Sequence, residues 1–205
     1  MVRSRTGFAG AVAALVALVT LVVPVGAASA DAALVLRGGA TSVTASPAVT
    51  STLVRNGILP LPAGGASEVP VVLPGGIGVK ATFPVNGGSV DAATLAGTVT
   101  HSGGLVFVNL ARWKAVTVSD FTIVIDGSPH LVATKVNGSP ASLRVFDLDL
   151  SGAKVATTSR GVVVSGIRVS FTGDAAMALN SSLGTKVFTA GLVAGSADTR
   201  LVPAT

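Results

Sequence analysis

The chain has 205 residues, of which 49% are hydrophobic, and a formal net charge of +5. It contains no cysteine, which excludes disulfides, thiolate metal sites and a cysteine nucleophile. Its basic residues are spread singly along the chain, so it lacks the clustered positive charge of a nucleic-acid-binding protein.

Residues 1–30 follow the three-part pattern of a cleavable signal peptide. Arg3 and Arg5 give a positive start, residues 7–25 are almost entirely apolar, and Ala28-Ser29-Ala30 supplies the small residues of a cleavage site. A membrane anchor is the alternative, because a helical span needs about 20 apolar residues. A proline and a glycine just before the small residues favour cleavage.

Cleavage predicts a single mature domain over residues 31–205, secreted to the extracellular medium. No cysteine follows the small residues to accept a lipid, and residues 198–205 carry no apolar tail. We therefore expect release without a remaining membrane attachment. Removing Arg3 and Arg5 leaves 12 basic and 9 acidic residues, a net charge of +3, which says little about partners.

The mature chain should begin with strands and one helix. Residues 33–45 predict two short strands around a Gly38-Gly39 turn. A short helix is expected next, since Ser46 suits the N-cap, Pro47 suits the first helical position, and Asn56-Gly57 is typical of a helix end.

The middle of the chain predicts β-structure. Four prolines and two glycine pairs make residues 60–78 a loop or edge segment, with at most a short strand at residues 69–73. Beyond it, runs rich in β-branched residues alternate with turn signals such as Asp126-Gly127 and Asn137-Gly138. The predicted strands are 79–85, 95–101, 104–110, 114–119, 121–125, 130–136, 141–150 and 161–171, with a further turn at Asn86-Gly87-Gly88.

A second helix is expected near the end of the chain. Thr172 suits its N-cap and Gly184 its end, and residues 187–192 predict a final strand. Together these elements predict a mainly β fold, an antiparallel sandwich or barrel-like sheet with two short α-helices.

His101 is the most prominent candidate for chemistry. Alternation along its strand places it on the apolar face with Leu95 and Val99, next to Ser102-Gly103-Gly104. A histidine there could ligate a metal or haem iron, or donate to a small ligand. The simpler interpretation, which we favour, is a histidine hydrogen-bonded to a nearby backbone carbonyl.

The other candidates favour structural interpretations. His130 follows a turn and is expected to be exposed. Asp147 and Asp149 share one strand face and could hold calcium or serve hydrolysis, but the solvent face of an amphipathic strand is favoured. Trp113, the single tryptophan, is interpreted as a core or interface anchor.

Several short segments occur in a familiar order over about residues 79–195. The segments are Gly97-Thr98-Val99-Thr100-His101-Ser102-Gly103-Gly104-Leu105, Leu131-Val132-Ala133, Phe146 to Leu150, Phe171-Thr172-Gly173, Leu179 to Gly184 and Phe188-Thr189-Ala190-Gly191. They resemble the HtaA-type domain of actinobacterial haem-uptake proteins, an exported β-rich module. They look most like secreted actinobacterial proteins with a His-Ser-Gly-Gly turn and a Leu-Asn-x-x-Leu-Gly helix end.

The resemblance implies haem binding, with His101 matching the glycine-flanked histidine of the family. Haem ligation in that family depends on tyrosine, and this chain has none. Phe188 stands where a family tyrosine is expected, and a phenyl ring cannot ligate iron. We therefore predict no tight haem complex, no resident cofactor and no metal site.

The leading hypothesis is a secreted, non-catalytic binding or cell-surface module, HtaA-like, whose partner is a small ligand or a cell-envelope component. The predicted ligand-binding residues are His101, Ser102, Gly103 and Gly104. One alternative is a haem-binding, haem-uptake protein that uses His101. Another is a structural or adhesive envelope protein, and a hydrolase using Asp147 and Asp149 comes last.

Overall fold

The computed structural model describes residues 33–204, so the predicted signal peptide lies outside the described residues. No helix in the described part of the chain is long and apolar enough to cross a bilayer. The elements in chain order are β1 (Ala33–Ala45), α1 (Pro47–Arg55), β2 (Ile58–Ala63), β3 (Ser67–Leu73), β4 (Gly76–Asp91), β5 (Gly97–His101), β6 (Gly104–Asn109), β7 (Lys114–Ile125), β8 (His130–Val136), β9 (Ser139–Asp149), β10 (Lys154–Thr158), β11 (Gly161–Phe171), α2 (Gly173–Leu183) and β12 (Val193–Pro203).

Eight of the strands close into an antiparallel barrel. Their order around the barrel is β7-β5-β4-β1-β12-β11-β9-β8, and β8 returns to pair with β7. The mainly β fold with two helices is therefore confirmed, and of the two predicted architectures the barrel-like one is correct. Closure removes the free edges that an open sheet of this length would expose.

The barrel wall divides where β5 meets β6. Both strands lie end to end along one edge of β7, β5 beside residues 122–125 and β6 beside residues 114–119. On its other side β5 pairs with β4, whereas β6 pairs with β2. Residues 76–82 of β4, which lie beyond the part that pairs with β5, pair with β3. The wall thus forms two leaves, β3–β4 and β2–β6, with residues 63–66 linking β2 to β3.

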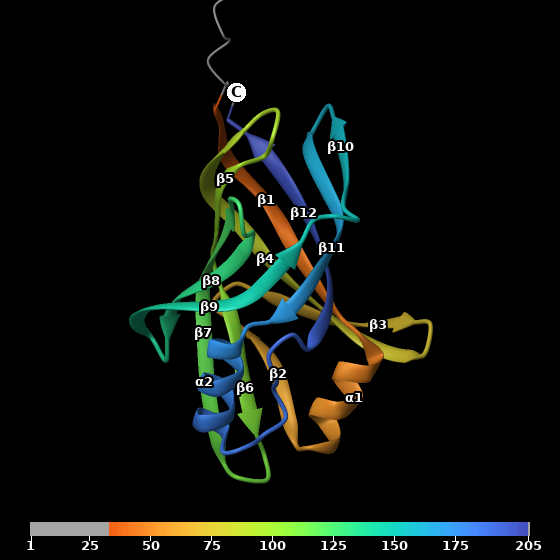
Figure 1. Cartoon of the computed structure of the whole chain (residues 1–205), viewed down its shortest axis with the longest axis vertical. Helices are drawn as coiled ribbons and strands as arrows, with labels where there is room; N and C mark the ends of the chain where they lie inside the picture. Colours follow the sequence, from red (N-terminus) through yellow and green to blue (C-terminus); the bar gives the residue numbers. More distant parts are fainter. Residues whose placement is uncertain (1–32, 205) are drawn as a thin grey trace, which may run out of the picture. The chain divides into compact units, whose positions relative to one another are not determined.

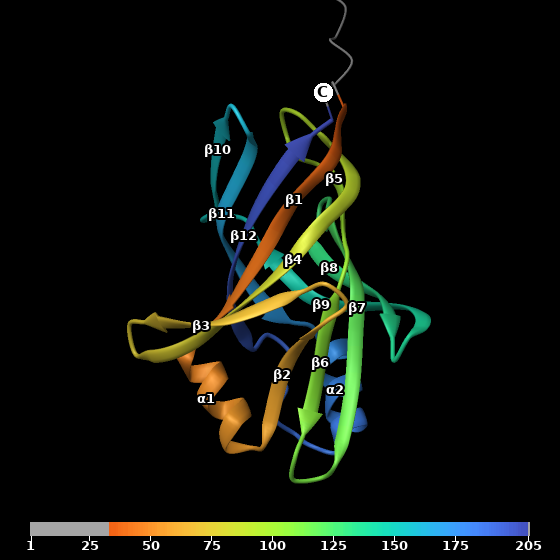
Figure 2. The same cartoon turned by 180° about the vertical axis from the view of Figure 1, so that it is seen from behind.

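Helix α1 packs against strands of both leaves. In Figures 1 and 2 the β3–β4 hairpin projects to one side, β2, β6 and β7 run on together, and α1 lies close to β2 and to the hairpin. Ser46 caps the helix by accepting a hydrogen bond from the Val49 N–H at 3.3 Å, as its sequence predicts. Val49 and Leu53 turn inward, so α1 covers the opening between the leaves.

Helix α2 packs against the β6–β7 hairpin and against β9. Thr172 accepts from the Ala175 N–H at 3.1 Å, and Gly184 ends the helix with a φ of 64°, so both predicted caps are confirmed. The loop that follows is held by the Asn180 side chain, which bonds both backbone groups of Phe188 at 2.7 and 3.1 Å.

Several predicted turns and strand ends are wrong. Gly38-Gly39 and Gly87-Gly88 are irregularities inside the continuous strands β1 and β4, where a Cβ on Gly39 would lie 1.9 Å from the Arg200 carbonyl oxygen. These glycines allow close backbone approach rather than a reversal. Residues 187–192 form a loop, and the last strand is β12. The exposed strand β10 was not expected.

Candidate functional site

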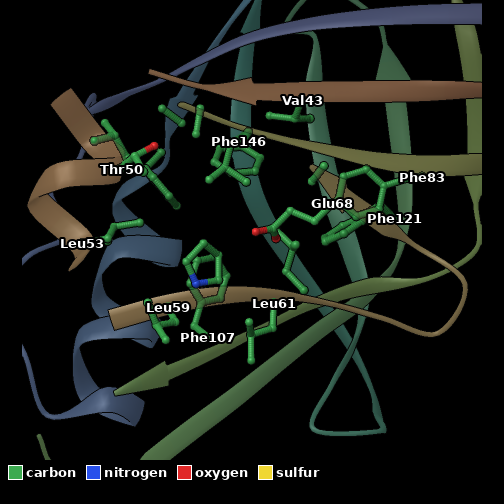
Figure 3. Close-up of a pocket in the computed structure, with 18 of the residues that line it drawn as sticks. Val43, Thr50, Leu53, Leu59, Leu61, Glu68, Phe83, Phe107, Phe121 and Phe146 are labelled. Carbon is green, nitrogen blue, oxygen red and sulfur yellow. The ribbon is translucent and has the colours of Figure 1, made fainter. Parts of the chain in front are cut away.

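An apolar cavity of about 200 Å³ opens between the two leaves of the wall. Its inner part is the barrel interior, and its outer part is bounded by α1, β2 and β3 (Figure 3). The lining residues come from eleven elements because the split exposes the barrel core. They are Val43, Ala45, Val49, Thr50, Leu53, Val54, Leu59, Pro60, Leu61, Glu68, Val79, Ala81, Phe83, Leu105, Phe107, Phe121, Leu131, Phe146, Phe171 and Ala194.

Five phenylalanines form much of the cavity wall: Phe83, Phe107, Phe121, Phe146 and Phe171. The rings of Phe83 and Phe121 meet edge to face at 5.1 Å, and those of Phe146 and Phe171 lie 4.8 Å apart. These ring–ring contacts restrict the four side chains, all of which line the cavity. The wall is therefore rigid, aromatic and ready to pack against an apolar molecule.

Glu68 places a carboxylate in this apolar space. It lies on β3 opposite Ala81 of β4, and its side chain points into the cavity (Figure 3). Oε2 is buried and has no hydrogen-bond partner among the described residues. Burial raises the pKa of Glu68, because an apolar surrounding disfavours its charged form. No lysine, arginine or histidine is among the lining residues of the described chain.

Thr50 of α1 contributes a second unpaired oxygen atom to the cavity lining. Its Oγ1 is buried without a hydrogen-bond partner among residues 33–204. The neighbouring hydroxyls of Ser51 and Thr52 both donate back to the Ala48 carbonyl, at 3.1 and 2.8 Å. Thr50 therefore differs from its neighbours in keeping a free hydroxyl, and that hydroxyl belongs to the cavity lining (Figure 3).

His101 lies inside the barrel and is only 2% exposed. Burial lowers its pKa to about 4, so the ring is neutral at pH 7. Nδ1 lies 3.1 Å from the Phe121 carbonyl, which can only accept, so Nδ1 carries the proton. Nε2 then accepts from the Thr41 hydroxyl at 2.7 Å, and Thr41 accepts from Thr199 at 3.0 Å.

The histidine therefore makes the backbone hydrogen bond that the simpler interpretation expects. Both ring nitrogens are used inside the protein, and neither is among the groups that line the cavity. Through the Phe121 carbonyl, His101 fixes the backbone that carries one of the cavity phenylalanines. A role for His101 in ligand binding stays a prediction.

Ser102, Gly103 and Gly104 form the junction between β5 and β6. The Ser102 N–H donates to the Pro84 carbonyl at 3.0 Å. Gly103 has a φ of 86°, and a Cβ there would lie 2.6 Å from the Ala66 nitrogen. The glycine thus lets the junction touch the 63–66 link between the leaves. Direct ligand contact by these three residues also stays a prediction.

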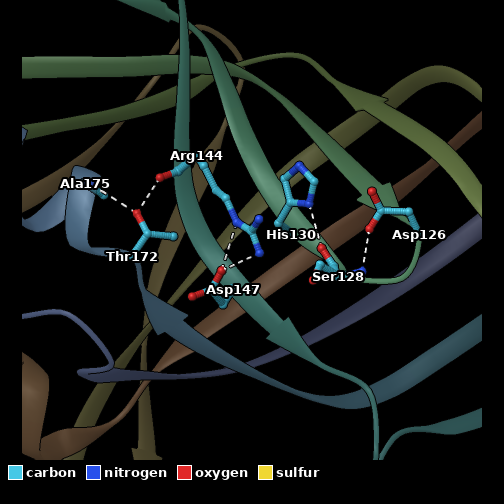
Figure 4. A network of polar contacts seen from close by, with 7 residues as sticks. All are labelled: Asp126, Ser128, His130, Arg144, Asp147, Thr172 and Ala175. Atoms are coloured by element: carbon cyan, nitrogen blue, oxygen red, sulfur yellow. Dashed lines mark hydrogen bonds and ion pairs between the residues drawn. The ribbon is translucent and has the colours of Figure 1, made fainter.

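The remaining candidates lie on the outside of the barrel. Asp147 pairs with Arg144, whose Nη2 is 2.7 Å away, and Asp149 accepts from the Ser151 N–H (Figure 4 shows the Arg144 pair). Hydrogen bonds from Ser151 lower the pKa of Asp149. His130 Nδ1 lies 2.7 Å from the Ser128 carbonyl oxygen (Figure 4). Within residues 33–204 no three potential metal-ligating side chains of His, Cys, Asp or Glu gather.

Trp113 lies at the tip of the β6–β7 hairpin and is 90% exposed. The interpretation as a core anchor is therefore wrong, whereas an interface role stays a prediction. A second apolar cavity of about 190 Å³ lies elsewhere in the barrel, between residues such as Ile123, Leu150 and Val164. No charged side chain lines it among the described residues.

Sequence reasoning missed Glu68 and Thr50. One signal was present: Glu68 is the single glutamate of the chain, and it begins the apolar run Val69-Pro70-Val71-Val72. Because side chains alternate between the two faces of a strand, an acid beside such a run can lie on the buried face. Thr50 offers no signal, since only the tertiary contacts distinguish it from Ser51 and Thr52.

No protein-family model matches the sequence, and no curated protein matches it. The fold matches the C-terminal domain of HtaA from Corynebacterium glutamicum with a TM-score of 0.56 at 16% identity, covering 83% of this chain and 99% of that one. A domain-swapped dimer of a variant of that domain gives a TM-score of 0.47 at 17% identity, covering 76% and 91%. The heme binding protein HtaB from the same organism gives 0.49 at 10% identity, covering 84% and 96%.

The resemblance to the HtaA-type domain is thus confirmed at the level of the fold. The identity of 16% leaves the ligand to be argued from this chain's own residues.

Proposed function

We propose that this chain is an exported, non-catalytic binding module that holds a small apolar molecule in the cavity between its two leaves. One observation carries the proposal. Glu68 Oε2 and Thr50 Oγ1 are both buried in an otherwise apolar cavity without a hydrogen-bond partner among the described residues. Buried polar groups are nearly always paired in folded proteins, and each unpaired one costs about 1 to 3 kcal/mol.

A ligand that pairs with these two oxygens would offset the free-energy cost of leaving them unpaired. Binding sites typically combine apolar and aromatic walls with a few polar groups that orient the bound molecule. The five phenylalanines and the two free oxygens have this composition. The volume also limits the ligand, because an apolar protein cavity of about 150 Å³ accommodates benzene. A cavity of about 200 Å³ therefore suits one ring with a few additional atoms, or an aliphatic body of similar size.

Haem is the second candidate, because the resemblance to the HtaA-type domain implies it. Protein ligands of haem iron are histidine, cysteine, methionine and tyrosine. None of these residues lines the cavity within residues 33–204, and both nitrogens of His101 are bonded inside the protein. The cavity residues therefore do not fit haem ligation, and we propose that the chain lacks tight haem binding.

Export and release complete the proposal. Residues 1–30 carry the signal-peptide pattern, and the mature protein would begin at Asp31. An envelope role without a small ligand is the competing possibility, and cell fractionation separates the two. Protein found only in the medium supports release.

The ligand hypothesis is tested with tert-butylbenzene, a neutral apolar probe, followed by calorimetry or by the rise in melting temperature. We expect saturable binding that Ala81→Leu abolishes, because the added side chain would occupy the cavity. Ala153→Leu, which adds the same atoms in the second cavity, is the matched control and should leave binding unchanged.

Absence of saturable binding by both this probe and its charged analogue phenyltrimethylammonium, or equal binding by the Ala81→Leu protein, would contradict the proposal. Haem is titrated in parallel. A Soret band that saturates at one haem per chain and is lost in His101→Ala would establish the haem-binding alternative instead.

A further inference from the structure

We propose that the cavity selects a small apolar ammonium cation, whose charge pairs with the Glu68 carboxylate and whose apolar body lies among the phenylalanines. This inference rests on the proposed function and names the chemical class of the ligand. It follows from three features of the cavity, which are the position of the carboxylate, the absence of a compensating charge among the lining residues, and the aromatic wall.

Among the described residues that line the cavity, Glu68 is the only ionisable one. The two ion pairs of the described residues are Lys135–Asp120 and Arg144–Asp147, so neither includes Glu68. Lys80 precedes Ala81 on the neighbouring strand β4, so by alternation its side chain lies on the face opposite to that of Ala81. Arg55 of α1 instead donates from Nη2 to the Thr52 hydroxyl at 3.5 Å. The carboxylate therefore meets no positive charge of the protein inside the cavity.

A partly buried carboxylate without a compensating charge favours a cationic partner over an apolar neutral one. Removing a carboxylate from water is costly, and an opposite charge within about 4 Å restores the balance. A neutral ligand without a hydrogen-bond donor would leave Oε2 unpaired. Burial raises the pKa of Glu68, so a cation that binds beside it would also bring that pKa back toward its usual range.

The aromatic wall favours an ammonium over a metal ion. Calcium takes six or more oxygens, and within residues 33–204 the cavity lining offers only Glu68 and Thr50 as polar side chains. Organic ammonium groups, by contrast, are attracted to the faces of aromatic rings and are weakly hydrated when substituted. Five phenylalanines line this one small volume. The chemistry of the wall and of the carboxylate thus points to one class of ligand.

The test compares phenyltrimethylammonium with tert-butylbenzene, which has the same shape without the charge. At pH 7 we expect the cation to bind roughly ten- to a hundredfold more tightly, as a partly solvent-exposed ion pair contributes. Glu68→Gln keeps the shape of the side chain and should reduce the preference to about one. Asp174→Asn removes an exposed acid on α2 and should leave the preference unchanged.

The pH dependence gives an independent readout, because the charge of the quaternary probe does not titrate. Binding of the cation should weaken as the pH falls through the raised pKa of Glu68, and the Glu68→Gln protein should show no such dependence. A preference for the cation that survives Glu68→Gln overturns the inference, as does equal binding of the two probes. Binding of tert-butylbenzene alone overturns it while leaving the proposed function standing, whereas binding of neither probe overturns both.

Discussion

His101 is a buried side chain and Glu68 has one buried carboxylate oxygen, and the two residues differ in whether the protein pairs these polar atoms. His101 is fully paired, since each ring nitrogen has a partner in the barrel interior. Glu68 has a buried oxygen without a partner among the described residues. A buried polar group that the protein leaves unpaired can make its hydrogen bond to a ligand. Glu68 therefore belongs to the site that we propose, whereas the contacts of His101 account for it as a structural residue.

The neutral state of His101 predicts a loss of stability in acid. Its pKa is about 4 in the folded protein and 6.5 ordinarily, so between these values the unfolded chain binds the proton and the folded chain does not. The contribution is complete above pH 6.5 and is lost as the pH falls toward 4. The free energy of unfolding should drop by about 3 kcal/mol between pH 7 and pH 4 from this residue alone.

Denaturant unfolding at several pH values checks this expectation. His101→Asn should flatten the dependence relative to the natural protein, whatever its absolute stability. His130→Asn, which changes a histidine outside the barrel, should not. An unchanged slope in the His101→Asn protein would show that the histidine is not buried neutral.

At the scale of elements, the division of the wall depends on the close contact between the β5–β6 junction and the link from β2 to β3. Gly103 makes that contact possible, because any side chain there would collide with Ala66. The sequence indicates a glycine-rich turn at this place but not its partner, which lies almost forty residues earlier. Glycine pairs have two structural uses, reversal and close approach, and local sequence does not separate them.

Gly103→Ala should destabilise the protein by about 2 kcal/mol, since it combines a positive φ with a backbone collision. Gly127→Ala is the matched control, because that glycine has open space around its Cβ position and should change stability by less than about 0.5 kcal/mol. Both values come from denaturant unfolding. Equal effects of the two substitutions would mean that the junction is not packed as described.

At the scale of the whole molecule, local signals predicted the kind of structure but not its pairing. The β-branched runs, the Asp126-Gly127 and Asn137-Gly138 turns and both capped helices are confirmed. Strand β12 was missed because its buried positions are mostly small or polar, such as Ala194, Ala197 and Thr199. Its period-two alternation was present without a bulky apolar run.

The cavity could not be predicted for a related reason. It exists because β4 leaves β5 and pairs with β3, which is a matter of long-range register. Glu68 and Thr50 lie on different elements and line the same cavity only through that arrangement. The resemblance to the HtaA-type domain predicted the fold. The residues that it indicated around His101 lie at the junction of the leaves, whereas the unpaired oxygens of Glu68 and Thr50 lie elsewhere.

The central claim is that the cavity between the leaves binds a ligand beside Glu68, and methyl NMR tests it most directly. Phenyltrimethylammonium is titrated into protein labelled at its leucine, isoleucine and valine methyl groups. The account predicts saturable shifts at Val43, Leu53 and Leu59, which line this cavity, and none at Ile123, Leu150 and Val164, which line the uncharged second cavity. Shifts confined to the second cavity, or none at either, would contradict it.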